Sequence, residues 1–153
     1  GVRAEYVGEA PREWTIEGSS RVDSPLQVLA EQYRRMARAA KVAEVIVTDR
    51  PLLMGLVYDD GEGHAFRRYV MTIFGRFANF NWRVDRDPGA GYDKRGRLHT
   101  LRQAGEIDNR VWDMLATRHV GAVVGTAPCD KLDILIVDAV LAKLGRKRSG
   151  SGG

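Results

Sequence analysis

A short β-branched run that ends in an acid constrains this chain more than any other feature. Val45-Ile46-Val47-Thr48 is followed at once by Asp49 and Arg50. Continuous β-branched runs are typical of buried parallel strands, and ligands of α/β proteins bind where such strands end. Asp49 is therefore expected at the carboxyl edge of a parallel sheet, where a carboxylate can hold magnesium through water. An Asp that only caps the following helix gives the same pattern, so this segment alone leaves both roles open.

The rest of the chain alternates predicted strands and helices. The clearest helix start is Ser24-Pro25, because Ser is a good N-cap, Pro fits the first helical turn and Gln27 completes a capping box. We expect strands at 2–7, 45–48, 79–84 and 121–125, and helices at about 25–41, 51–58, 64–76, 106–119 and 132–144. Alternating strands and helices predict an α/β protein whose parallel sheet is covered on both faces.

Length and composition favour one soluble domain. The chain has 153 residues, of which 44% are hydrophobic. This length is enough for one hydrophobic core and too short for two ordinary domains. Cys129 is the lone cysteine, so no intrachain disulfide can form. No apolar run approaches the roughly 20 residues of a membrane span, and we expect a cytoplasmic protein without a membrane partner.

Charge and glycine content divide the chain into a domain and a tail. The formal net charge is +4, and four basic residues lie within 143–148, so the rest of the chain is close to neutral. The basic net charge therefore does not indicate a nucleic-acid partner. We expect one domain at 1–145 and a flexible basic Gly-Ser tail at 146–153. Within the domain, about 85–102 is polar and Arg-rich without periodicity, which predicts a lid-like loop.

Four parts of the chain stand in an order that is more specific than any single motif. They are 5–14, 45–53, the strand at 79–86 with the loop at 92–97, and 106–108. Taken in order, these segments resemble the P-loop kinase-like ATPases of phages and bacteria, AAA-type domains that are related to nicotinamide riboside kinases and, more distantly, to nucleoside and nucleotide kinases.

The resemblance implies a three-layer α/β/α parallel sheet of the P-loop NTPase type. In that family the first strand leads into the Walker A motif, G-x-x-x-x-G-K-[ST], which occurs nowhere in this sequence. We therefore expect the fold to lack its first strand and P-loop, with the chain truncated at its amino end. A relative that never had the loop is the alternative.

The resemblance also implies catalytic roles for three residues. Asp49 matches the acid that family members place near magnesium. Glu9 and Arg12 match an acidic and basic pair that positions the acceptor hydroxyl and takes its proton. The alternative for Glu9 and Arg12 is a surface ion pair of little energetic weight.

Four further residues match nucleotide-binding positions. Arg86, Arg95 and Arg97 match the lid, where planar guanidiniums bind phosphate oxygens in pairs. Thr126 lies where nucleotide kinases hold the adenine by main-chain groups. A solvated loop is the alternative for the arginines, because Asp85, Asp87 and Asp93 are interleaved with them.

The function that the resemblance implies is an ATP- and Mg²⁺-dependent kinase in the intact protein. The γ-phosphoryl group would go to a small acceptor, namely a nucleoside, a nucleotide or nicotinamide riboside. Without the P-loop the present chain is expected to be inactive or weak. The alternative is a non-catalytic, degenerate nucleotide-binding or interaction domain. A nucleic-acid partner is the least favoured reading, and the oligomeric state stays open.

Overall fold

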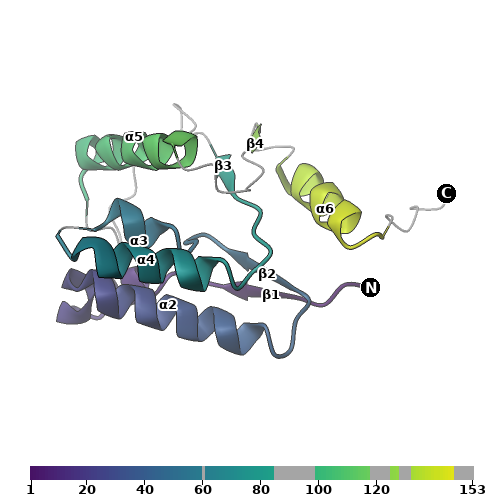
Figure 1. Cartoon of the computed structure of the whole chain (residues 1–153), viewed down its shortest axis with the longest axis horizontal. Coiled ribbons are helices and arrows are strands. Elements are labelled where there is room, and N and C mark those ends of the chain that lie inside the picture. Colours follow the sequence, from purple (N-terminus) through teal and green to yellow (C-terminus); the bar gives the residue numbers. More distant parts are fainter. Residues whose placement is uncertain (60, 85–98, 118–124, 128–131, 147–153) are drawn as a thin grey trace. The chain divides into compact units, whose positions relative to one another are not determined.

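The protein divides into two compact units. The structure, a computed structural model, describes residues 1–59, 61–84, 99–117, 125–127 and 132–146. The first unit comprises Gly1–Asn79 and Tyr92–Gly121, and the second comprises Phe80–Gly91 and Ala122–Gly153. Each unit contains one small parallel sheet (Figure 1).

The first unit is built around a two-stranded sheet. Strands β1 and β2 pair in parallel, from Ala4 opposite Val45 to Val7 opposite Thr48. The expected strands at 2–7 and 45–48 are thereby confirmed as a pair. The elements of this unit are β1 (Ala4–Val7), α1 (Ala10–Ile16), the 3₁₀ helix η1 (Ser20–Asp23), α2 (Pro25–Ala39), β2 (Val45–Thr48), α3 (Met54–Val57), α4 (Gly63–Phe74) and α5 (Leu101–Thr117).

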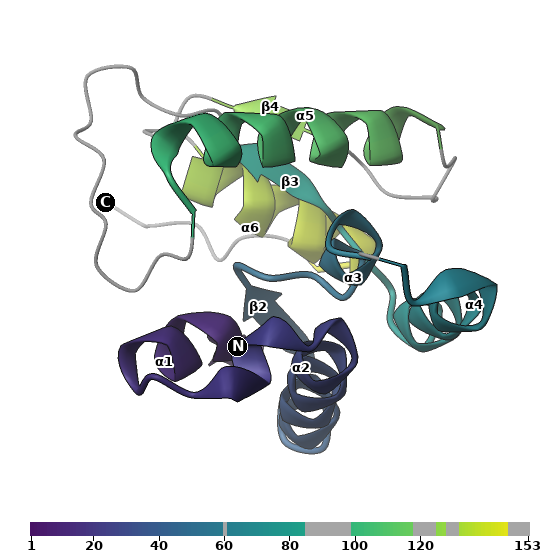
Figure 2. The ribbon, with the colours of Figure 1, turned by 90° about the vertical axis from the view of Figure 1, so that its left-hand side faces the viewer.

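Helix α2 begins where the sequence predicts. The Ser24 hydroxyl accepts a hydrogen bond from the backbone N–H of Gln27 at 3.3 Å, and Pro25 occupies the first turn. This cap satisfies a donor that the helix itself cannot pair. Helix α1 packs beside α2 (Figure 2), with Trp14 of α1 and Val28 of α2 in one small apolar cluster. Helix α2 therefore holds α1 through this apolar cluster.

The main core of the first unit lies against one face of the β1–β2 sheet. Leu29 of α2 and Ile73 of α4 are almost fully buried there, together with Val7 of β1. The opposite face carries Tyr6 and Val47, which are paired with each other and are 64% and 45% exposed. Side chains alternate across a strand, so Val7 and Tyr6 must point to opposite faces. Within the part that the structure describes, helices cover one face of this sheet.

The second unit contains β3 (Trp82–Val84), β4 (Gly125–Ala127) and α6 (Leu132–Lys143). Strands β3 and β4 pair in parallel. Helix α6 is followed by Gly145 with a φ of 64°, a left-handed conformation that glycine adopts without a Cβ penalty. The expected strand at 121–125 begins in residues outside the described part, and β4 lies at its carboxyl end.

The expected fold class is wrong. The three-layer α/β/α sheet of the P-loop NTPase type is absent from the described residues, which contain two separate two-stranded sheets and are otherwise mainly helical. Each strand is three or four residues long. Such short pairs bury little surface, so helix packing supplies most of the core. The sequence pattern located the strands, but it could not show which strands pair.

Candidate functional site

The candidate site lies where β1 and β2 end. Because Val7 is opposite Thr48 in a parallel pair, Gly8-Glu9 and Asp49-Arg50 leave the sheet at the same edge. Loops at this edge of parallel strands are where ligands of α/β proteins bind. The chain positions predicted for catalysis on two separate segments are thereby placed on neighbouring strand ends.

Tyr6 and Asp49 are joined directly at this edge. The Tyr6 hydroxyl donates a hydrogen bond to Oδ2 of Asp49 at 3.0 Å. Desolvation raises the pKa of Tyr6, and the bond to the Asp49 carboxylate and the charges of Asp49 and Glu9 raise it further. A phenol held in front of a carboxylate remains a donor, because ionising it would put two negative charges side by side.

Glu9 and Arg12 follow β1 in the chain. Glu9 is the N-cap residue of α1, and Arg12 lies in the first turn of that helix. The charge of Glu9 raises the pKa of Tyr6, and the charge of Arg12 lowers it. Of the predicted catalytic residues Asp49, Glu9 and Arg12, the structure joins Asp49 directly to Tyr6, a residue that sequence reasoning did not include.

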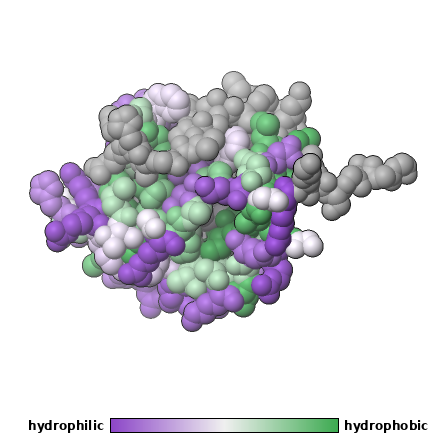
Figure 3. Space-filling view, turned by 45° about the vertical axis from the view of Figure 1, so that its right-hand side comes forward, coloured by the Kyte–Doolittle hydropathy of each residue, from purple (hydrophilic) through white to green (hydrophobic). Residues whose placement is uncertain are grey.

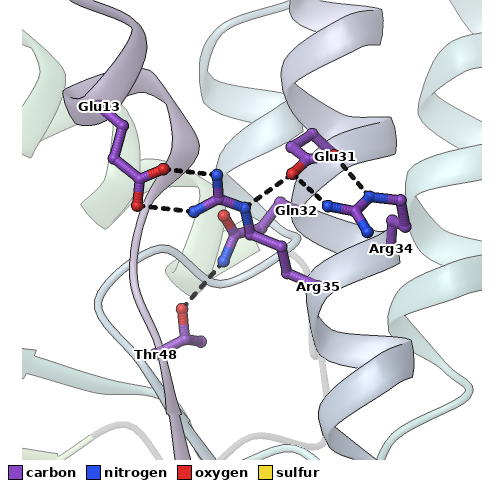
Figure 4. Close-up of polar contacts among 6 residues, drawn as sticks. All are labelled: Glu13, Glu31, Gln32, Arg34, Arg35 and Thr48. Carbon is purple, nitrogen blue, oxygen red and sulfur yellow. Dashed lines mark hydrogen bonds and ion pairs between the residues drawn. The ribbon is translucent and has the colours of Figure 1, made fainter. Parts of the chain in front are cut away.

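Helix α1 is fixed on α2 by ion pairs. The guanidinium of Arg35 on α2 reaches both oxygens of Glu13 on α1, at 2.8 and 2.6 Å, and Oε1 of Glu31 at 2.9 Å (Figure 4). Hydrogen bonds from Arg34 and then Arg35 lower the pKa of Glu31 to about 2, against burial, which raises it. This bidentate contact holds the helix that carries Arg12 in place.

Thr48, the last residue of β2, ties the strand end to α2. Its Oγ1 accepts a hydrogen bond from Nε2 of Gln32 at 3.1 Å (Figure 4). The same oxygen accepts one from the backbone N–H of Arg50 at 3.2 Å. Its hydroxyl lies 3.4 Å from the carbonyl oxygen of Arg50, to which it donates. These bonds set the direction in which the chain leaves the sheet at Asp49.

Arg50 extends the site toward α3. Its guanidinium carbon lies 4.7 Å from the centre of the Tyr58 ring, within the range of a cation–π contact. The Tyr58 ring in turn stacks on His99, with ring centres 5.8 Å apart and planes 13° from parallel. The stacked rings thus hold the positive charge of Arg50, the residue that follows Asp49.

The predicted nucleotide-binding residues are not part of this cluster as described. Arg86, Arg95 and Arg97 lie outside the described residues. Thr126 is in β4 of the second unit, in register with Arg83 of β3. The expected lid at about 85–102 also lies largely outside the described residues, but Leu101 and Arg102 begin helix α5.

Among the described residues, no group of three or more His, Cys, Asp or Glu side chains is placed to hold a metal ion. A divalent cation at Asp49 would therefore take most of its ligands from water and from a bound phosphate, as magnesium commonly does. Gln32 is the polar residue near the site that sequence reasoning missed. Its signal was its place on the apolar stripe of α2, between Leu29 and Met36.

Comparisons with family models, with curated proteins and with solved structures found no match to this chain. In the described residues, none of the helices is both long and apolar enough to cross a membrane. The fold and the site thus define a mainly helical protein with small parallel sheets, one of which ends in a hydrogen-bonded tyrosine and aspartate.

Proposed function

We propose that the strand ends of β1 and β2 form a magnesium- and phosphate-binding site, and that the protein is a kinase-like phosphotransferase. In this proposal ATP is the donor, Mg²⁺ binds at Asp49, and the acceptor is a small nucleoside, nucleotide or nicotinamide riboside. The observation that carries the proposal is the hydrogen bond from the Tyr6 hydroxyl to Asp49 at the edge where β1 and β2 end.

The three charged residues have complementary chemistry for phosphoryl transfer. A carboxylate such as Asp49 organises magnesium, which neutralises charge on the transferring group. Glu9 can accept the proton of an attacking hydroxyl, and Arg12 can stabilise phosphate oxygens with fixed positive charge. Their place at adjacent parallel strand ends supports this division of roles.

The phosphate cradle is the part that these residues do not supply. A Walker A loop binds the β- and γ-phosphates through backbone N–H groups and a lysine, and the sequence has no such motif. We therefore expect the 153-residue chain to bind Mg-ATP weakly and to turn it over slowly.

The test is a calorimetric titration of the wild-type chain and of Asp49→Asn with ATP, in the presence and in the absence of Mg²⁺. We expect the Asn variant to lose Mg²⁺-dependent ATP binding by roughly tenfold or more and to unfold at nearly the same temperature, because Asp49 is exposed. Asp23→Asn, an exposed acid in η1, is the matched control and should bind as wild type.

Turnover gives the second readout. Asp49→Asn should lower the rate of phosphoryl transfer by on the order of 100-fold. Glu9→Gln should lower the rate while leaving Mg-ATP affinity within about twofold, because a general base acts after binding. Activity within a few-fold of wild type in Asp49→Asn would mean that Asp49 is structural and that this magnesium assignment is wrong.

A non-catalytic interaction domain is the second candidate, and the open face of the β1–β2 sheet favours it. Tyr6 and Val47 are 64% and 45% exposed there, and Val42 just before β2 is 59% exposed. Hydrophobic residues also come to the surface between hydrophilic ones in the view of Figure 3. Exposed apolar patches commonly mark interaction surfaces. A chain that binds no Mg-ATP but loses a protein partner on Val47→Lys would support this candidate instead.

A further inference from the structure

Helix α4 buries one side in the first unit and exposes the other. Its apolar stripe, with Phe66, Val70 and Ile73, belongs to the main core. Residues on the far side of an amphipathic helix face solvent, and α4 lies at the outside of the unit in Figure 2. We call the exposed side the outer face of α4. It consists of His64, Arg68, Tyr69, Thr72 and, just past the end of the helix, Arg76.

The outer face carries positive charge that no acid of the helix balances. The sequence has no Asp or Glu between Glu62 and Asp85. Arg67, which precedes the outer-face arginine, is ion-paired with Asp59. Arg68 itself has no ion pair within the part of the chain that the structure describes. Its charge is therefore available to an anion from outside the chain.

Neutral partners hold Arg76 in place. Its Nη1 donates a hydrogen bond to the hydroxyl of Tyr33 on α2, and its guanidinium carbon lies 5.5 Å from the centre of the Tyr33 ring. The Tyr33 ring in turn packs edge-on against Phe77, with ring centres 6.4 Å apart. A ring and a hydroxyl position a guanidinium without cancelling its charge, whereas a carboxylate would neutralise it. Arg76 is thus a positioned cation at one end of the outer face.

Tyr69 adds an aromatic ring to these two cations. It is 45% exposed, directly follows Arg68 and stands seven residues, or about two helical turns, before Arg76. Guanidiniums bind phosphate oxygens, and exposed aromatic rings stack with unpaired bases. The bases of a duplex are already stacked on one another, so a single strand suits this face. The net charge of the chain does not reveal the face, because acids elsewhere balance its arginines.

We propose that the outer face of α4 binds single-stranded nucleic acid, with phosphates on Arg68 and Arg76 and a base stacked on Tyr69. An anionic membrane offers the same charge without bases, and the experiment separates it from a nucleic acid. The outer face shares no residue with the strand ends around Asp49. This binding therefore does not depend on the proposed phosphotransferase activity.

The experiment follows the fluorescence anisotropy of a labelled oligo(dT) of about 12 nucleotides, titrated with the full chain without Mg²⁺ or ATP. At about 50 mM NaCl we expect a dissociation constant of about 100 µM or tighter. Between about 50 and 200 mM NaCl the slope of log K against log salt should be roughly −1.4 or steeper, for two phosphate contacts. A duplex of equal length should bind more weakly. No binding at the lowest salt, or tighter binding of the duplex, would overturn the proposal.

Variants separate the phosphate contacts from the stacking contact. Arg68→Gln and Arg76→Gln should each make the salt slope shallower by about 0.7, because each removes one phosphate contact. Tyr69→Ala should weaken binding by about fivefold or more with the slope unchanged, and Tyr69→Phe should bind as wild type because it keeps the ring. Arg21→Gln, at an exposed arginine of η1, is the matched control and should keep both the affinity and the slope.

Three results would place the binding elsewhere and overturn the assignment. The first is a wild-type slope in both arginine variants, which would point to the basic residues at 143–148; Arg68→Gln decides this if Arg76→Gln fails to fold. The second is loss of oligonucleotide binding in Asp49→Asn, which should bind as wild type. The third is sedimentation with phosphatidylcholine–phosphatidylserine vesicles that depends on Arg68, since lipid would then be the ligand.

Discussion

At the scale of single residues, the Tyr6–Asp49 contact gives the candidate site a measurable signature. Partial desolvation and the hydrogen bond to Asp49 hold the pKa of Tyr6 above its ordinary value of 10.0. Asp49→Asn removes the negative charge but keeps a side chain of the same shape, so the pKa of Tyr6 should move down toward that value. An NMR titration of ¹³C-labelled tyrosine measures it, with Tyr69, an exposed tyrosine of α4, as internal reference. An unchanged Tyr6 pKa would mean that the contact with Asp49 does not persist in solution.

Glu31 makes stability depend on acid pH. Its pKa is about 2 in the folded protein, because Arg34 and Arg35 hold it ionised, against an ordinary value of 4.5. The folded pKa is depressed, so the stabilisation is full above about pH 5 and is lost as the pH falls toward 2. With solvent screening we expect about 1 kcal/mol from this carboxylate.

Glu31→Gln checks this pH dependence. The variant should be less stable than wild type at pH 7 by about 1 kcal/mol, and the two should converge near pH 2. Urea unfolding at a series of pH values gives both quantities. Glu17→Gln, an exposed acid at the end of α1, is the control and should follow the wild-type curve. A constant difference between Glu31→Gln and wild type across the pH range would contradict the ion-pair origin.

At the scale of elements, two helical glycines respond to alanine in opposite ways. A Cβ on Gly55 of α3 would lie 3.1 Å from Cγ2 of Val70 and 3.3 Å from Cδ1 of Leu29. Gly55→Ala should therefore lower the free energy of unfolding by about 1–3 kcal/mol, because three helices must move apart. A Cβ on Gly105 of α5 would meet nothing within 4 Å, so Gly105→Ala should raise stability by roughly 0.5–1 kcal/mol.

Thermal and urea unfolding of both glycine variants measures these changes. Opposite signs support the close approach of α3 to α2 and α4. If Gly55→Ala is as stable as Gly105→Ala, the three helices are not packed as closely as described.

Local signals in the sequence predicted elements well, and non-local contacts were not predictable. Ser24 and Pro25 specify the start of α2 through bonds within four residues, and Gly145 ends α6 in the same local way. Asp49 was expected at the carboxyl end of a parallel strand, and it directly follows β2, which pairs in parallel with β1. The pairing of strands into one wide sheet was predicted wrongly, because short strands carry no mark of their partners.

The candidate site was predictable only in part for the same reason. Asp49 and Glu9 follow within two residues of the predicted strands, so parallel pairing places both at the same edge of the sheet. Tyr6 stands beside the buried Val7 in β1 and was assigned to the strand rather than to the site. Gln32 required the helical period of α2, since a polar residue on an apolar stripe is the one sign that its amide is buried.

At the scale of the molecule, α2 links the two apolar clusters of the first unit. Leu29 of α2 belongs to the main core with Ile73, and its neighbour Val28 belongs to the cluster around Trp14. Because α2 contributes side chains to both apolar clusters, it cannot separate from one cluster while it stays packed in the other. The first unit is therefore expected to unfold in one cooperative transition, which loosens the strand ends and the site together with the core.

Ile73→Ala tests that cooperativity. Ile73 is fully buried, at 0% exposure, so its truncation should cost about 3 kcal/mol of unfolding free energy. With Trp82→Phe and Trp112→Phe in the background, fluorescence reports Trp14 alone, and its urea midpoint should shift as far as the midpoint measured by circular dichroism. Ile16→Ala, at a residue 60% exposed, should leave both midpoints nearly unchanged. A Trp14 midpoint that stays in place while the circular-dichroism midpoint moves would show that the two clusters unfold separately. The ion pairs of Arg35 with Glu13 would then be what links α1 to α2.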